Sequence, residues 1–264
     1  MKSKPALLLL TLLLSSCAHH GGVKVIPIYS AEEEYGHAKR LFERKKYGDA
    51  FTAFQQFVYN HEGSSLMPDA VFYEGESKFM DRDYSGAVEF FEEVVSKYPT
   101  AAYADRAQYR LGLCYYKESP SWELDQEMTE KAIEAFQIFL IKYPQSLLVP
   151  DVNRMIYTCH DKLAHKRYDS GRIYLTLRLY DSARVYFKST QEDFPNSSWS
   201  REAAFGLAEC DFLQKNYREA QKGYYLLKFN ALCGTIVPRR AFLVFLQEGF
   251  RRKQSPIYRV RRRR

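Results

Sequence analysis

The chain has 264 residues, with 39 Lys or Arg, 32 Asp or Glu and a formal net charge of +7. The positive excess lies in residues 238–264, which hold ten basic residues and one acidic residue, Glu248. Blocks of like charge are usually solvated tails, and no groove-reading helix or RNA-binding aromatic signature accompanies this one. Composition therefore excludes nucleic acid as the expected partner, and the rest of the chain is mildly acidic.

The first residues are typical of an export signal. Lys2 and Lys4 precede an apolar run from Ala6 to Leu14, and small residues follow before Cys17. This order defines a secretory signal, and the run is far shorter than the about 20 residues that span a bilayer. Residues 14–17, Leu-Ser-Ser-Cys, resemble a bacterial lipobox, in which Cys17 would carry acyl chains such as palmitate and become the mature N-terminus. The alternative is an ordinary signal peptide with an incidental cysteine. Acyl chains would anchor the protein to a membrane without spanning it.

One sequence pattern recurs along the chain. Residues 83–99, DYSGAVEFFEEVVSKYP, and residues 179–195, LYDSARVYFKSTQEDFP, share an alanine, an aromatic residue four positions later and a proline twelve positions later. Five alanines fit this register, at Ala50, Ala87, Ala132, Ala183 and Ala220. The aromatic partners are Phe54, Phe91, Phe136, Phe187 and Tyr224. Small residues twelve positions before the alanines are Ala38, Gly75, Gly171 and Ala208, and Gly112 serves the third copy if about eight residues are inserted.

Helix geometry explains the register. Offsets of three, four and seven return to one helix face, small residues let two helices approach, and proline ends the second helix. We expect helix pairs at about 31–61, 66–97, 101–142, 147–193 and 197–228. The third pair would have its turn lengthened by residues 117–129, and the fourth would have a long first helix. One hairpin cannot bury its apolar face alone, so hairpins must stack, and the pattern looks like tetratricopeptide repeats.

The predicted fold class is all-α, a tetratricopeptide-like solenoid of about five repeats; a nonrepeating helical bundle would not explain so many coincident positions. The expected organisation is a lipoprotein signal peptide at 1–16, a tether at 17–30, repeats at 31–228 and a basic non-repeat tail at 229–264.

A lipobox, a short tether and five repeats together resemble the BamD family, lipoproteins of the bacterial outer-membrane β-barrel assembly machinery. The similarity covers about residues 14–228 and is strongest at residues 131–146, 161–174 and 194–217. The tail from residue 236 departs from the family, because it lacks the usual polar final helix.

The resemblance implies a scaffold on the periplasmic face of the outer membrane. Its N-terminal repeats would bind unfolded outer-membrane proteins, and its C-terminal repeats would dock the barrel-forming assembly subunit, with other lipoproteins of that complex as further partners. Carried over by position, the substrate residues are Tyr59, Gly63, Leu66, Phe72, Tyr73 and Phe79. The docking residues are Tyr168, Arg172, Tyr174 and Arg201. For each, the simpler reading is a core residue or part of a solvated face.

No catalytic motif is apparent, so we expect neither an enzyme nor a cofactor. GxSxG, phosphate-loop and HExxH patterns are missing from the sequence, and His160 and His165 are five residues apart, which does not align them as a helical metal pair. The spacing of the cysteines other than Cys17 matches no zinc-binding pattern. We favour buried thiols at these positions, with disulfide bonds as the alternative. These cysteines are Cys114, Cys159, Cys210 and Cys233. The alternative function is a cell-envelope repeat scaffold that coordinates other periplasmic or peptidoglycan-associated proteins.

Overall fold

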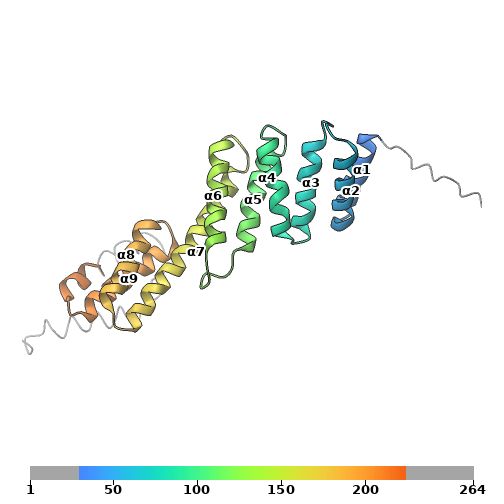
Figure 1. The fold of residues 1–264 in the computed structure, drawn as a ribbon. Helices are drawn as coiled ribbons and strands as arrows, with labels where there is room; N and C mark the ends of the chain where they lie inside the picture. The colour runs from blue at the N-terminus through green and yellow to red at the C-terminus, as the bar shows by residue number, and fades with distance from the viewer. Residues whose placement is uncertain (1–29, 224–264) are drawn as a thin grey trace, which may run out of the picture.

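A computed structural model describes residues 30–223, and this part of the chain forms helices and turns only (Figure 1). The complete helices are α1 (Ala31–Glu43), α2 (Tyr47–Asn60), α3 (Met67–Met80), α4 (Tyr84–Lys97), α5 (Ala104–Glu118), α6 (Glu127–Lys142), α7 (Val149–Thr176), α8 (Tyr180–Asp193) and α9 (Ser198–Leu213). A further helical stretch begins at residue 217 and reaches the end of the described part. The all-α hairpin fold is therefore confirmed. Cys17, Tyr224 and Cys233 lie outside the described residues.

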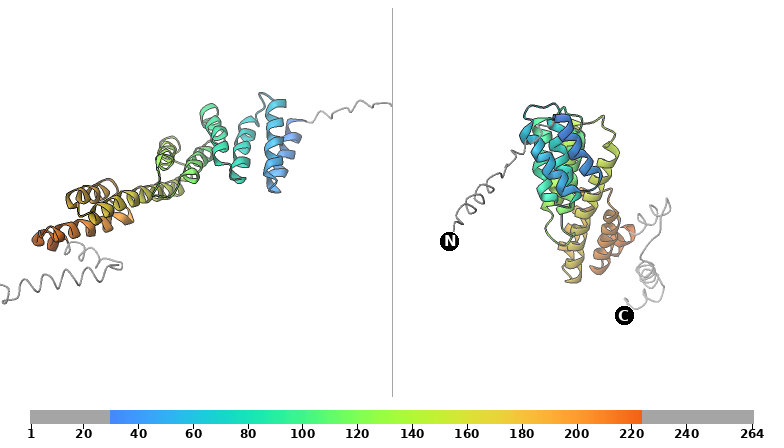
Figure 2. Two further views of the ribbon diagram at one scale, coloured as in Figure 1. Left: turned by 60° about the horizontal axis from the view of Figure 1, so that its bottom comes forward. Right: turned by 90° about the vertical axis from the view of Figure 1, so that its right-hand side faces the viewer.

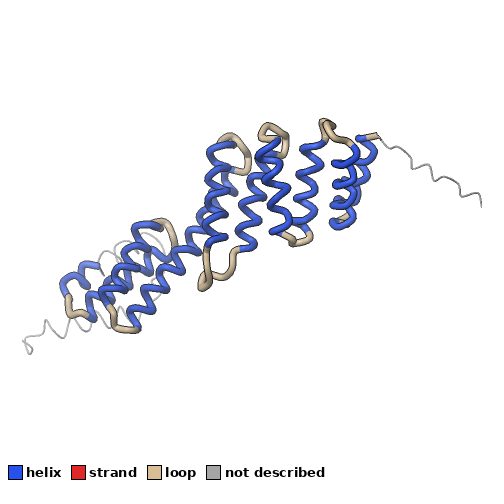
Figure 3. The backbone as a smooth tube through the Cα atoms, viewed as in Figure 1, coloured by secondary structure: helices blue, strands red, loops and turns tan. Residues whose placement is uncertain are grey.

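Antiparallel hairpins stack side by side in a row. The turns within hairpins lie along one edge of the row and the turns between hairpins along the other (Figure 3). Ser30 begins α1 with a capping box, in which its hydroxyl accepts from the Glu33 amide and the Glu33 carboxylate accepts from the Ser30 amide. Within residues 30–223, no helix combines the length and apolarity needed to cross a membrane.

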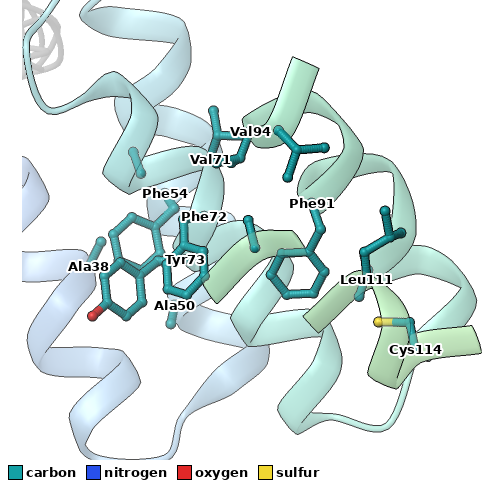
Figure 4. Packing of buried hydrophobic residues seen from close by; sticks show 14 of the residues in the cluster. Ala38, Ala50, Phe54, Val71, Phe72, Tyr73, Phe91, Val94, Leu111 and Cys114 are labelled. Atoms are coloured by element: carbon teal, nitrogen blue, oxygen red, sulfur yellow. The ribbon is translucent and has the colours of Figure 1, made fainter. Parts of the chain in front are cut away.

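The repeated alanines and phenylalanines form the contact between the two helices of a hairpin. The alanines of all five copies are fully buried, as are the phenylalanines of the first four. A β-carbon on Gly75 would lie 2.9 Å from the Phe91 ring, and one on Gly112 would lie 2.5 Å from the Phe136 ring. Figure 4 shows Ala38, Ala50 and Phe54 in this packing. The small residue is thus required because the aromatic ring occupies the space of a side chain.

Four of the turns within hairpins share one backbone conformation. Lys45, Arg82, Arg178 and Lys215 have φ between 60° and 67°. In the second hairpin the Arg82 amide donates to the Phe79 carbonyl and the Asp83 amide donates to the Lys78 carbonyl. These two bonds define a Schellman motif, whose left-handed position usually holds glycine. A cation there offsets part of the strain, because it lies near the negative end of the helix dipole.

Replacing Arg82 by glycine is expected to stabilise the protein by about 0.5–1 kcal/mol. The change relieves a left-handed conformation that costs an L-residue about 1–2 kcal/mol, less the added chain entropy of glycine. Thermal unfolding of Arg82→Gly measures this gain. As a control, Gln137→Gly on the exposed side of α6 should lose about 1 kcal/mol. A loss of stability at Arg82 of the same size would contradict the assigned strain.

Helix α7 interrupts the regular stack. Its first half buries Val152 and Cys159 with residues of α5 and α6, and its second half buries Tyr168 and Leu175 with residues of α8 and α9. Cys159 and Gly171, which packs on the Phe187 ring, are twelve residues apart. Twelve residues at about 100° each leave these positions about a third of a turn out of phase. The last hairpins are therefore displaced along α7 from the first three (Figures 1 and 2).

Candidate functional site

Three of the predicted substrate residues lie near the turn between the first two hairpins. Tyr59, in the last turn of α2, is 85% exposed. Gly63 adopts a φ of 85°, and no atom lies within 4 Å of the position that a β-carbon would take. Leu66 is half-buried and packs against the core. Together these residues offer one exposed aromatic ring beside a small apolar surface.

Phe79 lies apart from them. It lies in the last turn of α3, thirteen residues after Leu66, which precedes the first residue of that helix; thirteen helical residues correspond to about 20 Å. The guanidinium of Arg110 lies over its ring, 4.6 Å from the centroid, and also pairs with the buried carboxylate of Glu76. This cluster joins α3 to α5 and was not anticipated from the sequence. The structure thus divides the predicted substrate residues between the two edges of the second hairpin.

Phe72 and Tyr73 belong to the hydrophobic core. Phe72 stacks on Tyr103 with ring centroids 4.7 Å apart. Tyr73 stacks on Phe54 at 5.5 Å, and both are labelled in Figure 4. Tyr73 is only 9% exposed, and the Lys39 ammonium lies 3.5 Å from its ring centroid. A role for these two residues in binding stays a prediction. Truncating either one would also remove core packing.

The predicted docking residues all lie on α7 and α9. Tyr168 is buried against Phe187, and Tyr174 stacks on Tyr186 with ring centroids 5.1 Å apart. Arg172 pairs with Glu209, with Nη1 3.6 Å from Oε2, whereas Arg201 on α9 is exposed. Of the four, the guanidinium of Arg201 is the one most accessible to a partner.

Burial keeps the described cysteines in the thiol form. Cys114, Cys159 and Cys210 are free and buried. Burial raises the pKa of Cys114 and Cys159 to about 12 and that of Cys210 to about 11. Reactive cysteines have a lowered pKa and some exposure, so these three are structural. Among residues 30–223, no group of three or more His, Cys, Asp or Glu side chains is arranged to hold a metal ion.

Glu74 is a buried carboxyl group on α3. It is 4% exposed, and burial, followed by the nearby Glu93 and Glu89, raises its pKa to about 8. The group is therefore largely protonated at neutral pH. This buried acid departs from the apolar pattern of the repeat, and the sequence offered no sign of it.

A cleft of about 480 Å³ lies between the turns that follow α4 and α6. Its walls come from residues 99–102, Asp105 and residues 142–146, and each of the two turns contains a Tyr-Pro pair. The Ser146 hydroxyl donates to Asp105 at 2.6 Å and ties the walls together. Next to the lining, Leu147 is 96% exposed. The repeated Tyr-Pro turn was the signal in the sequence that could have located this cleft.

The register of small residues against buried phenylalanines, repeated over stacked hairpins, defines a helical repeat protein of the tetratricopeptide type. The family model YfiO, described as "Outer membrane lipoprotein", matches residues 29–183. The chain belongs to this family.

Two relatives named "Outer membrane protein assembly factor BamD" are similar along most of the chain. The one from Rickettsia prowazekii is 26% identical over 227 residues, which cover 85% of this chain and 89% of the relative. The one from Caulobacter vibrioides is 27% identical over 193 residues, which cover 73% and 63% respectively. Among solved structures, the TPR2AB domain of yeast Sti1 in a complex with pHSP90 has a TM-score of 0.39 at 12% identity, covering 75% of this chain and 89% of that one.

Proposed function

We propose that this protein is an outer-membrane protein assembly factor, held on the periplasmic face of the outer membrane by lipid on Cys17. The observation that carries the proposal is the similarity to the Rickettsia assembly factor over 85% of this chain and 89% of that protein. Such coverage is much longer than a single repeat, and a single shared repeat would indicate only the fold. Membership of a family of outer membrane lipoproteins supports the same location.

In this proposal the two ends of the scaffold bind different partners. The first two hairpins bind unfolded barrel proteins, and α7 with α9 docks the barrel-forming subunit of the machinery. The predicted substrate residues lie on α2, α3 and the turn between them, far along the row of helices from α7–α9 (Figure 1). This separation supports simultaneous occupation, because a ligand at one end leaves the other end accessible.

Removing the lipid attachment site is expected to release the protein from the membrane. In Cys17→Ala the acyl chains that would hold the protein on the membrane cannot be added. Fractionation of cells after a high-salt wash should find the variant in the soluble periplasm and the unchanged protein in the outer membrane. A variant that stays with the membrane would contradict anchoring through this residue.

Binding of a barrel-derived peptide tests the substrate role. Barrel strands carry aromatic residues at the membrane interfaces, and aromatic anchors dominate many peptide interfaces. We expect a labelled peptide from the C-terminal strand of a barrel protein, ending in an aromatic residue, to bind the full chain at about micromolar Kd. Replacing that residue by alanine should weaken binding about tenfold, and Tyr59→Ala or Phe79→Ala should weaken it by roughly threefold to tenfold. Fluorescence anisotropy measures each Kd.

Tyr157→Ala is the matched control, since Tyr157 is an exposed tyrosine on α7, away from the first two hairpins. Its affinity should equal that of the unchanged protein. Equal affinity for the native and alanine-terminated peptides would contradict substrate recognition and favour a general cell-envelope scaffold.

A further inference from the structure

The described apolar clusters on the two halves of α7 are separate, with a break between residues 163 and 168. Among the apolar side chains of these clusters, Leu163 is the last of α7 that packs with the third hairpin, and Tyr168 is the first that packs with the last hairpins. Ala164 between them is fully buried but belongs to neither cluster. No residue belongs to both of these described clusters. Side-chain packing between neighbours is what normally fixes adjacent hairpins in a solenoid. The angle between the two halves therefore needs another support.

His165 lies inside this break, and its ring is covered on both faces. Trp122, from the extended turn of the third hairpin, stacks on it with ring centroids 3.8 Å apart and an interplanar angle of 29°. Trp199, near the start of α9, stacks on it at 3.7 Å and 5°. Burial lowers the pKa of His165, which favours the neutral ring. One flat side chain of α7 thus joins the third hairpin to α9.

Polar contacts on both sides hold the stack in place. The Lys162 ammonium donates to the Ser119 hydroxyl at 2.6 Å, and the Lys166 ammonium donates to the Leu124 carbonyl at 2.6 Å. These lysines flank His165 on α7 and fasten both ends of the turn. On the side of α9, the Ser198 amide donates to the Asp161 carboxylate at 2.8 Å. The contacts converge on the short stretch of α7 where the core is interrupted.

We propose that the turn of residues 119–126 is a strap that fixes the angle between the first three hairpins and the last two, and that His165 latches it by stacking between Trp122 and Trp199. Such a strap explains why the third hairpin carries a long turn beside α7, a helix that is itself too long for a regular repeat. Shortening the turn would remove Trp122 and the carbonyl that Lys166 reaches.

Hydrogen exchange of the full chain tests the latch. Trp199→Ala, 73 to 80 residues along the chain from the turn, should raise exchange of the amides of residues 119–126 by about threefold to tenfold, the range expected for a lost aromatic pair. His165→Ala should do the same. His165→Phe keeps a flat ring and should restore protection. Phe212→Ala removes another aromatic side chain from α9 and should leave the turn unchanged.

The two tryptophans of the chain are both in the stack, so their emission reports whether it forms. Small-angle X-ray scattering should show a wider distribution of distances in His165→Ala than in His165→Phe. Unchanged exchange in the turn of Trp199→Ala would overturn the proposal, as would His165→Phe behaving like His165→Ala. An unchanged scattering profile in His165→Ala would show that the stack does not set the angle.

Discussion

Valine in place of Gly112 is expected to destabilise the protein by about 3 kcal/mol, at the upper end of the usual cost of overpacking. A β-carbon at this position would lie 2.5–2.8 Å from three atoms of the Phe136 ring. That ring is fully buried, so it has no free space into which to move. For a domain of this size the melting temperature should fall by roughly 6–12 °C, measured by circular dichroism.

Gly48→Val provides the comparison, because the nearest atom to a β-carbon on Gly48 is Asp81 Oδ2 at 3.9 Å. Its effect should stay within about 0.5 kcal/mol. Combining Gly112→Val with Phe136→Leu should cost less than the sum of the two single changes, since the smaller side chain makes room. Simple additivity of the two changes would mean that Gly112 and Phe136 are not in contact.

Glutamine in place of Glu74 is expected to stabilise the protein, with a gain that grows with pH. The folded protein holds the Glu74 proton up to a pKa of about 8, against an ordinary value of 4.5. Below pH 4.5 both states are protonated and Glu74 costs little. As pH rises to about 8, the unfolded chain ionises but the buried group resists, so the free energy of unfolding falls.

Glutamine cannot ionise and avoids this loss. At about 1.4 kcal/mol per pKa unit, the gain should reach roughly 3–5 kcal/mol at pH 8 and become small near pH 5. Chemical denaturation at several pH values measures it. Glu134→Gln, on an exposed position of α6, should show no such trend. A gain at Glu74 that is constant from pH 5 to pH 8 would refute the raised pKa.

The repeat itself was predictable from sequence because its physics is local. Ala87 and Phe91 are four residues apart, so one helix face carries both, and the small residue twelve positions before Ala87 faces them across a hairpin. The third copy was the hardest, since its turn displaces the register, yet Gly112 packs against Phe136 as the inserted spacing predicts. The extra length of the first helix in the fourth hairpin was also visible in the apolar and aromatic spacing.

The surfaces were less predictable, because they depend on how hairpins pack against one another. Phe72 and Tyr73 occupy positions that a groove could expose, but the neighbouring hairpins place Phe54 and Tyr103 on their rings. The stack at His165 could likewise not be predicted from the sequence, because its three residues come from a turn and two different helices. Residue spacing along one helix predicts which residues share a face, but it does not predict which neighbouring elements cover that face.

The interrupted core at α7 also bears on how the chain folds. Contacts stay close along the sequence: even the hydrogen bond from Tyr143 to the Pro99 carbonyl joins residues only 44 apart. Closing loops of this length costs little entropy, and chains rich in such contacts fold quickly. Because the clusters on either side of the break share no residue, each half can nucleate by itself. Folding can then begin at either end of the array, with α7 completing its helix as the two halves meet.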